Sequence, residues 1–363
     1  MPTSILLAAL TACAPPAPDS GGGDASSRCE TPAPTVEPLD LLAGHRTVEA
    51  PVPADWLTET RSVPVHLWYP TEATEGTPAS YIELFSDPRS LEDAPFADPG
   101  LPCKLPLVVY SHGSQAWAGN NSPLLRQLVA QGWVAAAPDH VGNTLVDNWD
   151  PRPISYSMTR VADIRATLDA IEALPDDDPL HDRVDTSRVV VAGHSFGGQT
   201  AWLLAGPTFD TATVEARCDS DVLGCSEAER QAFSTSPGDA RVVAVMPLDG
   251  FADTDLVAPS GWETASVPIL FLSKAEDGDS HPIETAAAAD LTWARFEGAC
   301  HETFTNSPVQ CSTFDKQEGQ ELTAAFLTAL AATTVLGLEG SPYAGILDGS
   351  TSLDARITVQ STR

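Results

Sequence analysis

Residues 189–200, VVVAGHSFGGQT, place a serine between two glycines directly after an apolar run. The run predicts a buried strand, and the small residues after it predict a tight turn into a helix. Gly193-His194-Ser195-Phe196-Gly197 fits the G-x-S-x-G pattern, in which the glycines leave room for a strained turn that projects the serine hydroxyl above the sheet. Because a hydroxyl is a weak nucleophile until a base removes its proton, the pattern predicts a base near Ser195.

Apolar runs alternate with helical patterns along the rest of the chain. Strand composition is found at residues 61–70, 105–114, 133–138, 188–193, 241–250 and 267–274, and helical spacing at 122–133, 157–174, 197–204 and 318–336. Residues 71–103, rich in Pro, Asp and Ser, are expected to form a long surface loop. Strands that are apolar throughout predict the α/β class, with a mostly parallel central sheet flanked by helices on both faces. Ligands bind such a sheet at the carboxyl ends of its strands, where all the candidate residues fall.

The base for Ser195 is expected to be a histidine in the later part of the chain. His194 lies inside the turn and cannot reach back to its neighbour's hydroxyl. His281, in the charged stretch EDGDSHP, has the setting of a solvated loop residue. His301, in FEGACHETFTN, follows the last expected strand, and we predict it to be the base.

The acid that holds the base must accept the other imidazole N–H, which fixes the tautomer and stabilises the imidazolium. Asp249 ends the apolar run VVAVMPLDGF and is its only charged residue, and a carboxylate in such a setting is costly unless it is paired. Asp277 and Asp279 follow the next strand, in a stretch with the character of a solvated loop. Asp249 is therefore favoured, and Asp277 and Asp279 remain alternatives.

Two N–H donors are needed to stabilise the oxyanion of an acyl-transfer intermediate. The residue after the nucleophile, Phe196, supplies one amide. The loop after LPLVVY contains SHGS, in which Ser114 offers the second amide. His112 in the same loop is expected to brace the loop rather than to react.

The motifs GHSFGG, VVYSHGS, PDH, PLDG and CHETF together resemble the α/β-hydrolase superfamily. In combination they are most similar to its platelet-activating-factor-acetylhydrolase and dienelactone-hydrolase-like branch, over about residues 61–336. That resemblance implies the following roles: Ser195 as nucleophile, Asp249 as acid, His301 as base, and Ser114 and Phe196 as amide donors. Cutinase-like and polyester-degrading relatives carry their acid after the following strand, at the place of AEDGDS, so Asp277 and Asp279 stay open.

The leading hypothesis is a serine carboxylic-ester hydrolase that forms an acyl-enzyme on a small-molecule or lipid ester and requires no metal or organic cofactor. One alternative is a cutinase or polyester hydrolase-like enzyme with its acid at Asp277 or Asp279. Another is a catalytically silent surface-binding protein on the same fold, for which a lost triad member would be expected, and none is lost. Nothing in the sequence pattern bears on oligomeric state.

The charge balance excludes some partners. The chain has 50 acidic and 19 basic residues, a net charge of −31. Such a surface repels nucleic acid and anionic membranes, so contact with a membrane is expected only through an N-terminal lipid.

The N-terminus predicts export. The apolar run SILLAAL is too short to span a bilayer, which needs about 20 residues, but it suits the apolar region of a signal peptide. LTAC resembles the bacterial lipobox, whose cysteine, here Cys13, is acylated and becomes the mature N-terminus. We therefore expect residues 1–12 to be a signal peptide, 13–35 a lipid-anchored flexible tether, 36–345 the hydrolase domain with an insertion at about 207–240, and 346–363 a C-terminal tail. The chain is placed at a bacterial cell envelope, lipid-anchored or secreted.

The remaining six cysteines are an even number, which in an exported chain predicts three disulfides. The close spacings favour two pairs and leave a third: Cys218–Cys225, Cys300–Cys311 and Cys29–Cys103. No C-x-x-C or His-rich ligand spacing is present in the sequence, so we expect no metal site.

Overall fold

The computed structural model of the 363-residue chain describes residues 41–53, 61–98, 104–147, 154–250, 256–275, 282–307, 311, 314–338 and 342–362. The expected signal peptide and tether, with Cys13 and Cys29, lie outside these ranges. The same is true of Cys103 and of the alternative acids Asp277 and Asp279.

The strands of the described residues form one sheet in the order β11-β10-β9-β8-β7-β5-β6-β2-β1-β4-β3. Its parallel centre consists of β6 (Val134–Pro138), β5 (Leu105–Ser111), β7 (Val184–His194), β8 (Val242–Leu248), β9 (Ile269–Lys274) and β10 (Leu291–Phe296). Every residue of β5 and β6 is buried, as expected for strands whose two faces are both covered. The predicted α/β class with a mostly parallel sheet is confirmed.

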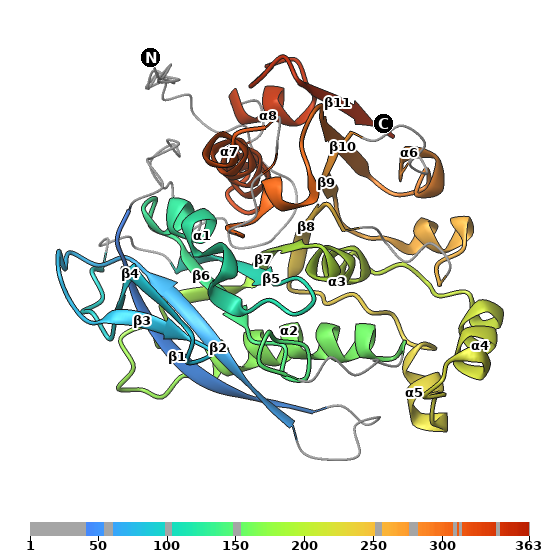
Figure 1. Cartoon of the computed structure of the whole chain (residues 1–363), viewed down its shortest axis with the longest axis horizontal. Coiled ribbons are helices and arrows are strands. Elements are labelled where there is room, and N and C mark those ends of the chain that lie inside the picture. Colours follow the sequence, from blue (N-terminus) through green and yellow to red (C-terminus); the bar gives the residue numbers. More distant parts are fainter. Residues whose placement is uncertain are drawn as a thin grey trace, which may run out of the picture.

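Helices cover both faces of this sheet (Figure 1). One apolar core lies under α2 (Tyr156–Glu172) and α3 (Phe196–Leu204). The other lies under α1 (Ser122–Val129), α7 (Lys316–Thr334) and α8 (Pro342–Leu347). The described part of the chain holds no helix with the length and apolar character to cross a membrane.

Strands at or next to the two edges of the sheet were missed by the sequence analysis. Residues 71–103 were expected to be a loop, but they contain β3 (Pro78–Tyr81) and β4 (Phe85–Glu92), which pair antiparallel. Residues 346–363 were expected to be a tail, and they contain β11 (Ile357–Ser361), paired antiparallel with β10. The remaining strands, β1 (Ala43–Val52) and β2 (Arg61–Tyr69), pair antiparallel and join the edge to β6. Edge strands face solvent on one side and carry polar residues, so their composition is close to that of loops.

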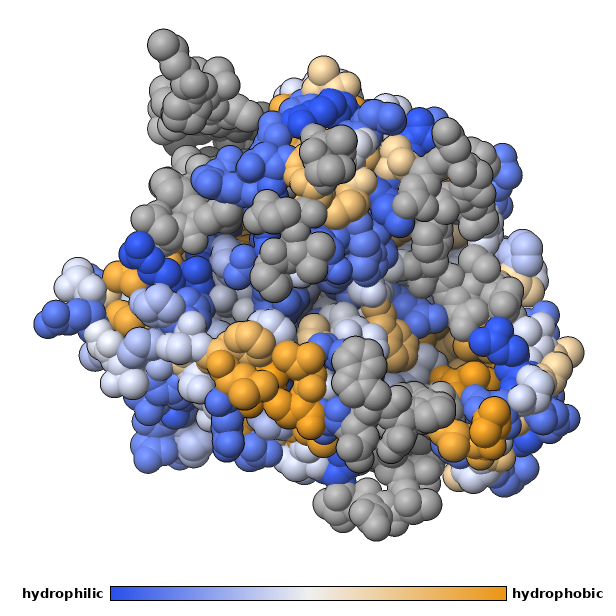
Figure 2. Space-filling view, viewed as in Figure 1, coloured by the Kyte–Doolittle hydropathy of each residue, from blue (hydrophilic) through white to orange (hydrophobic). Residues whose placement is uncertain are grey.

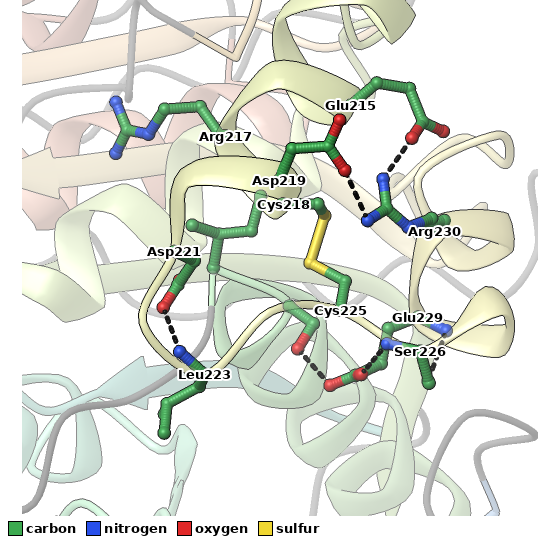
Figure 3. The surroundings of a disulfide bond; sticks show 12 residues. Glu215, Arg217, Cys218, Asp219, Asp221, Leu223, Cys225, Ser226, Glu229 and Arg230 are labelled. Carbon is green, nitrogen blue, oxygen red and sulfur yellow. Dashed lines mark hydrogen bonds and ion pairs between the residues drawn. A yellow bond between two sulfur atoms is a disulfide. The ribbon is translucent and has the colours of Figure 1, made fainter.

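The expected insertion at residues 207–240 contains α4 (Thr211–Ser220) and α5 (Glu227–Ala232), which lie at one end of the molecule (Figure 1). A disulfide joins Cys218, in α4, to Cys225, in the segment that leads to α5 (Figure 3). Arg230 of α5 forms ion pairs with Glu215 and Asp219 of α4. The insertion is therefore held together by its own covalent and ionic contacts.

Candidate active site

Ser195 lies at a sharp turn between β7 and α3. Its φ of 56° and ψ of −120° are strained for a residue with a side chain. A Cβ atom on Gly193 would overlap the carbonyl oxygen of Gly197, and one on Gly197 would overlap that of Ser111. Only glycines fit on either side of the turn, which explains the G-x-S-x-G spacing, and the turn leaves Ser195 half-buried at the carboxyl edge of the sheet.

Asp249 follows β8, the strand beside β7. The Ser195 amide donates to the carbonyl oxygen of Leu248 at 2.9 Å, so the two turns are fixed to each other. The Asp249 side chain is only 2% exposed, and it accepts two hydrogen bonds. One comes from the Lys274 amide at 3.0 Å, and the other from His301 Nδ1 at 2.6 Å. These contacts supply the pairing that a buried carboxylate requires.

His301 begins a short 3₁₀ helix, His301–Phe304, in the loop after β10. Cys300 forms a disulfide with Cys311, so the backbone beside His301 is covalently fixed. The carbonyl oxygen of His301 accepts a hydrogen bond from His194 Nε2 at 2.8 Å, and the two imidazole rings lie 4.5 Å apart. Since His194 adjoins Ser195, this contact places His301 beside the turn that carries the serine.

The two histidines have opposite electrostatic environments. The hydrogen bond that His301 donates to Asp249 raises the pKa of His301 above its ordinary value of 6.5. Burial lowers the pKa of His194 to about 4, so its ring is neutral at neutral pH and can hold a fixed Nε2–H donor. Because His301 donates from Nδ1 to Asp249, its Nε2 is left to accept a proton.

The expected amide donors lie on two elements near this turn. Phe196 is the first residue of α3, and the first amides of a helix have no acceptor within the helix and lie at its positive end. Ser114 follows β5, and its hydroxyl accepts a hydrogen bond from Asn143 Nδ2 at 3.1 Å. Among the described residues, no backbone acceptor takes the amide proton of Ser114 or Phe196.

His112 lies in the loop that carries Ser114. Its Nδ1 donates to the carbonyl oxygen of Gly113 at 2.7 Å, and its Nε2 accepts from the His140 amide at 2.9 Å. The ring is fully buried, and burial lowers its pKa well below 6.5. These contacts agree with a bracing role for His112.

Several buried polar residues behind this loop were missed by the sequence analysis. The set comprises Ser111, His140, Asn143, Arg160 and Asp163. A sequence signal existed for two of them, because Arg160 and Asp163 interrupt the apolar face of the helix that contains Val161 and Ile164. Charged side chains on the buried side of a helix are unusual unless each has its own polar partners.

Comparison with known proteins identifies the family. A family model described as "Alpha/beta hydrolase family" matches residues 99–342, about two thirds of the chain. The chain belongs to the alpha/beta hydrolase family.

This alpha/beta hydrolase also shares its fold with solved structures. A ferulic acid esterase from Streptomyces cinnamoneus, solved at 2.4 Å resolution, superposes with a TM-score of 0.62 at 22% sequence identity. The match covers 88% of this chain and 96% of the esterase chain. No curated protein sequence matches the chain.

Proposed function

We propose that this alpha/beta hydrolase is a serine carboxylic-ester hydrolase in which Ser195 is the nucleophile, His301 the base and Asp249 the acid. The observation that carries the proposal is the 2.6 Å contact between His301 and Asp249, beside a serine held at a positive φ. Three residues far apart in sequence thus converge at one edge of the sheet. This arrangement supports a triad of the Ser-His-Asp type.

The reaction follows from these positions. His301 Nε2 removes the hydroxyl proton as Ser195 Oγ attacks the ester carbonyl, and the amides of Phe196 and Ser114 bind the oxyanion. His301 then protonates the leaving alcohol, which leaves an acyl-enzyme. Water, deprotonated by the same imidazole, releases the acid and restores the serine.

The position of the acid bears on the branch of the family. Asp249, after β8, contacts His301 directly, and this supports the arrangement of the acetylhydrolase and dienelactone-hydrolase-like branch. A cutinase-like enzyme would use Asp277 or Asp279, which are outside the described residues. A silent binding protein would have no need for the paired imidazole and strained serine.

An apolar surface near Ser114 supports an ester with an apolar acyl or alcohol group. Trp117, three residues after Ser114, stacks on Phe85 with ring centroids 3.8 Å apart. The loops after β5 and β6 are joined by backbone hydrogen bonds, and the second of them exposes Val141 and Val146. Figure 2 shows an apolar patch in front of α2, where these loops run. The fold likeness to a ferulic acid esterase makes an aromatic ester a natural test substrate.

The two disulfides support export, because such bonds persist in oxidising compartments. With the lipobox-like LTAC, we propose a lipid-anchored protein of the bacterial cell envelope, tethered through Cys13. The third expected pair, Cys29–Cys103, is part of the same proposal.

The experiment is to label the folded protein with a fluorophosphonate, map the labelled peptide, and measure hydrolysis of nitrophenyl esters from acetyl to palmitoyl and of a ferulate ester. We expect stoichiometric modification of Ser195 and loss of both labelling and hydrolysis in Ser195→Ala. A folded wild-type protein that neither labels nor hydrolyses any of these esters would instead support the binding protein.

A further inference from the structure

Arg160 connects the two elements that carry the proposed amide donors. It lies in α2 with no exposed surface, and all three of its nitrogens donate hydrogen bonds. The acceptors are uncharged oxygen atoms: Thr200 Oγ1 at 3.2 Å, Asn143 Oδ1 at 2.9 Å, Ser111 Oγ at 3.2 Å and the carbonyl oxygen of His112. Arginine can make such a set because its guanidinium is a planar fork of five N–H donors.

The first connection runs to the loop of Ser114. Arg160 binds the carbonyl oxygen of His112, two residues before Ser114. It also binds the side-chain oxygen of Asn143, whose nitrogen donates to the Ser114 hydroxyl at 3.1 Å. The carbonyl oxygen of Asn143 accepts from the Gln115 amide at 3.1 Å, which holds the loop from its other side. The Ser114 amide therefore lies between two points that Arg160 fixes.

The second connection runs to the start of α3. The Arg160 guanidinium lies 4.7 Å from the centroid of the Phe196 ring, a cation–π contact. Arg160 Nε donates to the Thr200 hydroxyl, which in turn donates to the carbonyl oxygen of Phe196 at 3.1 Å. One side chain thus contacts both amide-bearing segments.

None of these acceptors carries a negative charge, so the hydrogen bonds do not neutralise the charge of Arg160. Asp163, the buried carboxylate nearby, forms a two-pronged ion pair with Arg61, with distances of 3.1 and 2.7 Å. Burial lowers the pKa of Arg160 to about 10, so the guanidinium stays protonated at neutral pH. Burial also lowers the pKa values of His112 and His140 well below 6.5, so neither ring adds charge. Arg160, Arg61 and Asp163 together therefore carry one net positive charge. Asp139, a further buried carboxylate near His112, is hydrogen-bonded to His66.

We propose that Arg160 is a positioning residue for oxyanion stabilisation, which holds the Ser114 and Phe196 amides in register and places a positive charge behind them. The inference rests on the proposed ester hydrolysis. Fixed donors are effective because they need no reorganisation when the negative charge forms. Arg160 acts through these amides and does not touch the reacting atoms.

The test compares Arg160→Gln with Arg126→Gln, which removes another buried arginine. Arg126, on α1, pairs with Asp87 on β4, and within the described part of the chain its side-chain hydrogen bonds reach none of the proposed triad residues or amide donors. We expect both variants to lose stability, but only Arg160→Gln to lower kcat, by about 100-fold, the effect of losing one oxyanion donor. KM should stay within about threefold, because the donors act on the transition state. Arg160→Lys, which keeps the charge but not the fork, should recover part of kcat.

A second readout separates oxyanion stabilisation from general damage. A thiocarbonyl accepts hydrogen bonds poorly, so the ratio of rates for a nitrophenyl ester and its thiono analogue reports on the amide donors. We expect this ratio to fall in Arg160→Gln and to stay at the wild-type value in Arg126→Gln. An unchanged ratio in folded Arg160→Gln, or an equal loss of kcat in the two variants, would overturn the inference.

Milder variants decide the question if Arg160→Gln does not fold. Thr200→Val removes the hydrogen-bonded link to Phe196 and leaves the ring contact. Asn143→Ala removes the link to the Ser114 hydroxyl and leaves the contact with the His112 carbonyl oxygen. Each should lower kcat and the thiono ratio by about three- to tenfold, and wild-type values in both would overturn the inference. A wild-type protein without esterase activity or labelling would refute the proposed function itself, an outcome distinct from either of these.

Discussion

Removal of the disulfide beside His301 tests whether this bond has an effect on activity beyond its effect on stability. We consider the double variant Cys300→Ser/Cys311→Ser, which opens a loop with a sequence separation of 11 residues. In the chain-entropy treatment, closing such a loop stabilises the fold by about 2.8 kcal/mol. The matched control is Cys218→Ser/Cys225→Ser, with a separation of 7 residues and a corresponding value of about 2.4 kcal/mol. The two variants should therefore lose nearly the same stability.

Their activities should differ, because only one bond adjoins the proposed base. The His301 side chain is 39% exposed and depends on its backbone, Asp249 and His194 for its position. If the opened segment occupies about ten positions in the folded protein, of which one is productive, that position costs about 1.4 kcal/mol more, which is about tenfold in kcat. In the control variant kcat should stay within about twofold of the wild-type value.

The measurements are urea unfolding followed by fluorescence, and steady-state hydrolysis of nitrophenyl butyrate, both without reductant. The outcome we expect is a similar loss of unfolding free energy in the two variants and a loss of kcat in one. If both variants lose kcat equally, the disulfide has only a global role. If Cys300→Ser/Cys311→Ser is as active as the wild type, the disulfide does not position His301, and the reasoning is wrong.

Further predictions concern the acid, the two histidines and the N-terminus. Asp249→Asn should lower kcat by about 10⁴, whereas Asp277→Asn should leave it within about threefold; steady-state kinetics that show the reverse would move the acid to the cutinase-like position. Because Asp249 raises the pKa of His301, the acid limb of a plot of kcat/KM against pH should lie above 6.5, and it should shift toward lower pH in Asp249→Asn. The pKa of His194 is about 4 in the folded protein and 6.5 unfolded, so its contribution to stability is complete above pH 6.5 and is lost as pH falls toward 4, by up to ~3 kcal/mol. Urea unfolding at pH 7 and 4.5 should show a smaller drop in His194→Gln than in the wild type, and equal drops would contradict the assignment. Mass spectrometry of the native N-terminus should find Cys13 acylated; an unmodified Cys13 would refute the lipid anchor.

The central part of the fold was predictable because burial on both faces leaves a simple pattern. Residues 105–111 and 242–248 are apolar almost throughout, and both form central parallel strands. The turn at Ser195 was predictable for a different reason: a Cβ at Gly193 or Gly197 would overlap backbone atoms, so this geometry restricts the sequence directly.

The edge strands and the Arg160 contacts were not predictable in the same way. β4 (FSDPRSLE), next to the edge strand β3, contains a proline and three charged residues, and Pro88 lies where the register between β3 and β4 is irregular, a position that tolerates proline. Arg160 contacts residues from the loops after β5 and β6 and from α3. These partners show no regular spacing in the sequence that would predict the contacts. Contacts of this kind follow from the sheet order, which is itself a product of folding.

A second set of serine, histidine and aspartate in the structure shows why residue type and contact do not by themselves define a reactive site. Ser111 Oγ lies 2.9 Å from His140 Nε2, and His140 Nδ1 lies 2.8 Å from Asp163 Oδ2. All three side chains are fully buried, so no ester can reach the hydroxyl.

The same three residue types therefore have a structural role in the buried set and a proposed catalytic role in the set that contains Ser195. Ser111 ends a strand in ordinary conformation, and its hydroxyl is occupied by His140 and Arg160. Ser195 is held at a positive φ in a half-buried turn, next to an imidazole that is partly exposed. What distinguishes the proposed nucleophile is the strained backbone that presents it to substrate, and the two flanking glycines are the feature of the sequence that makes this strain possible.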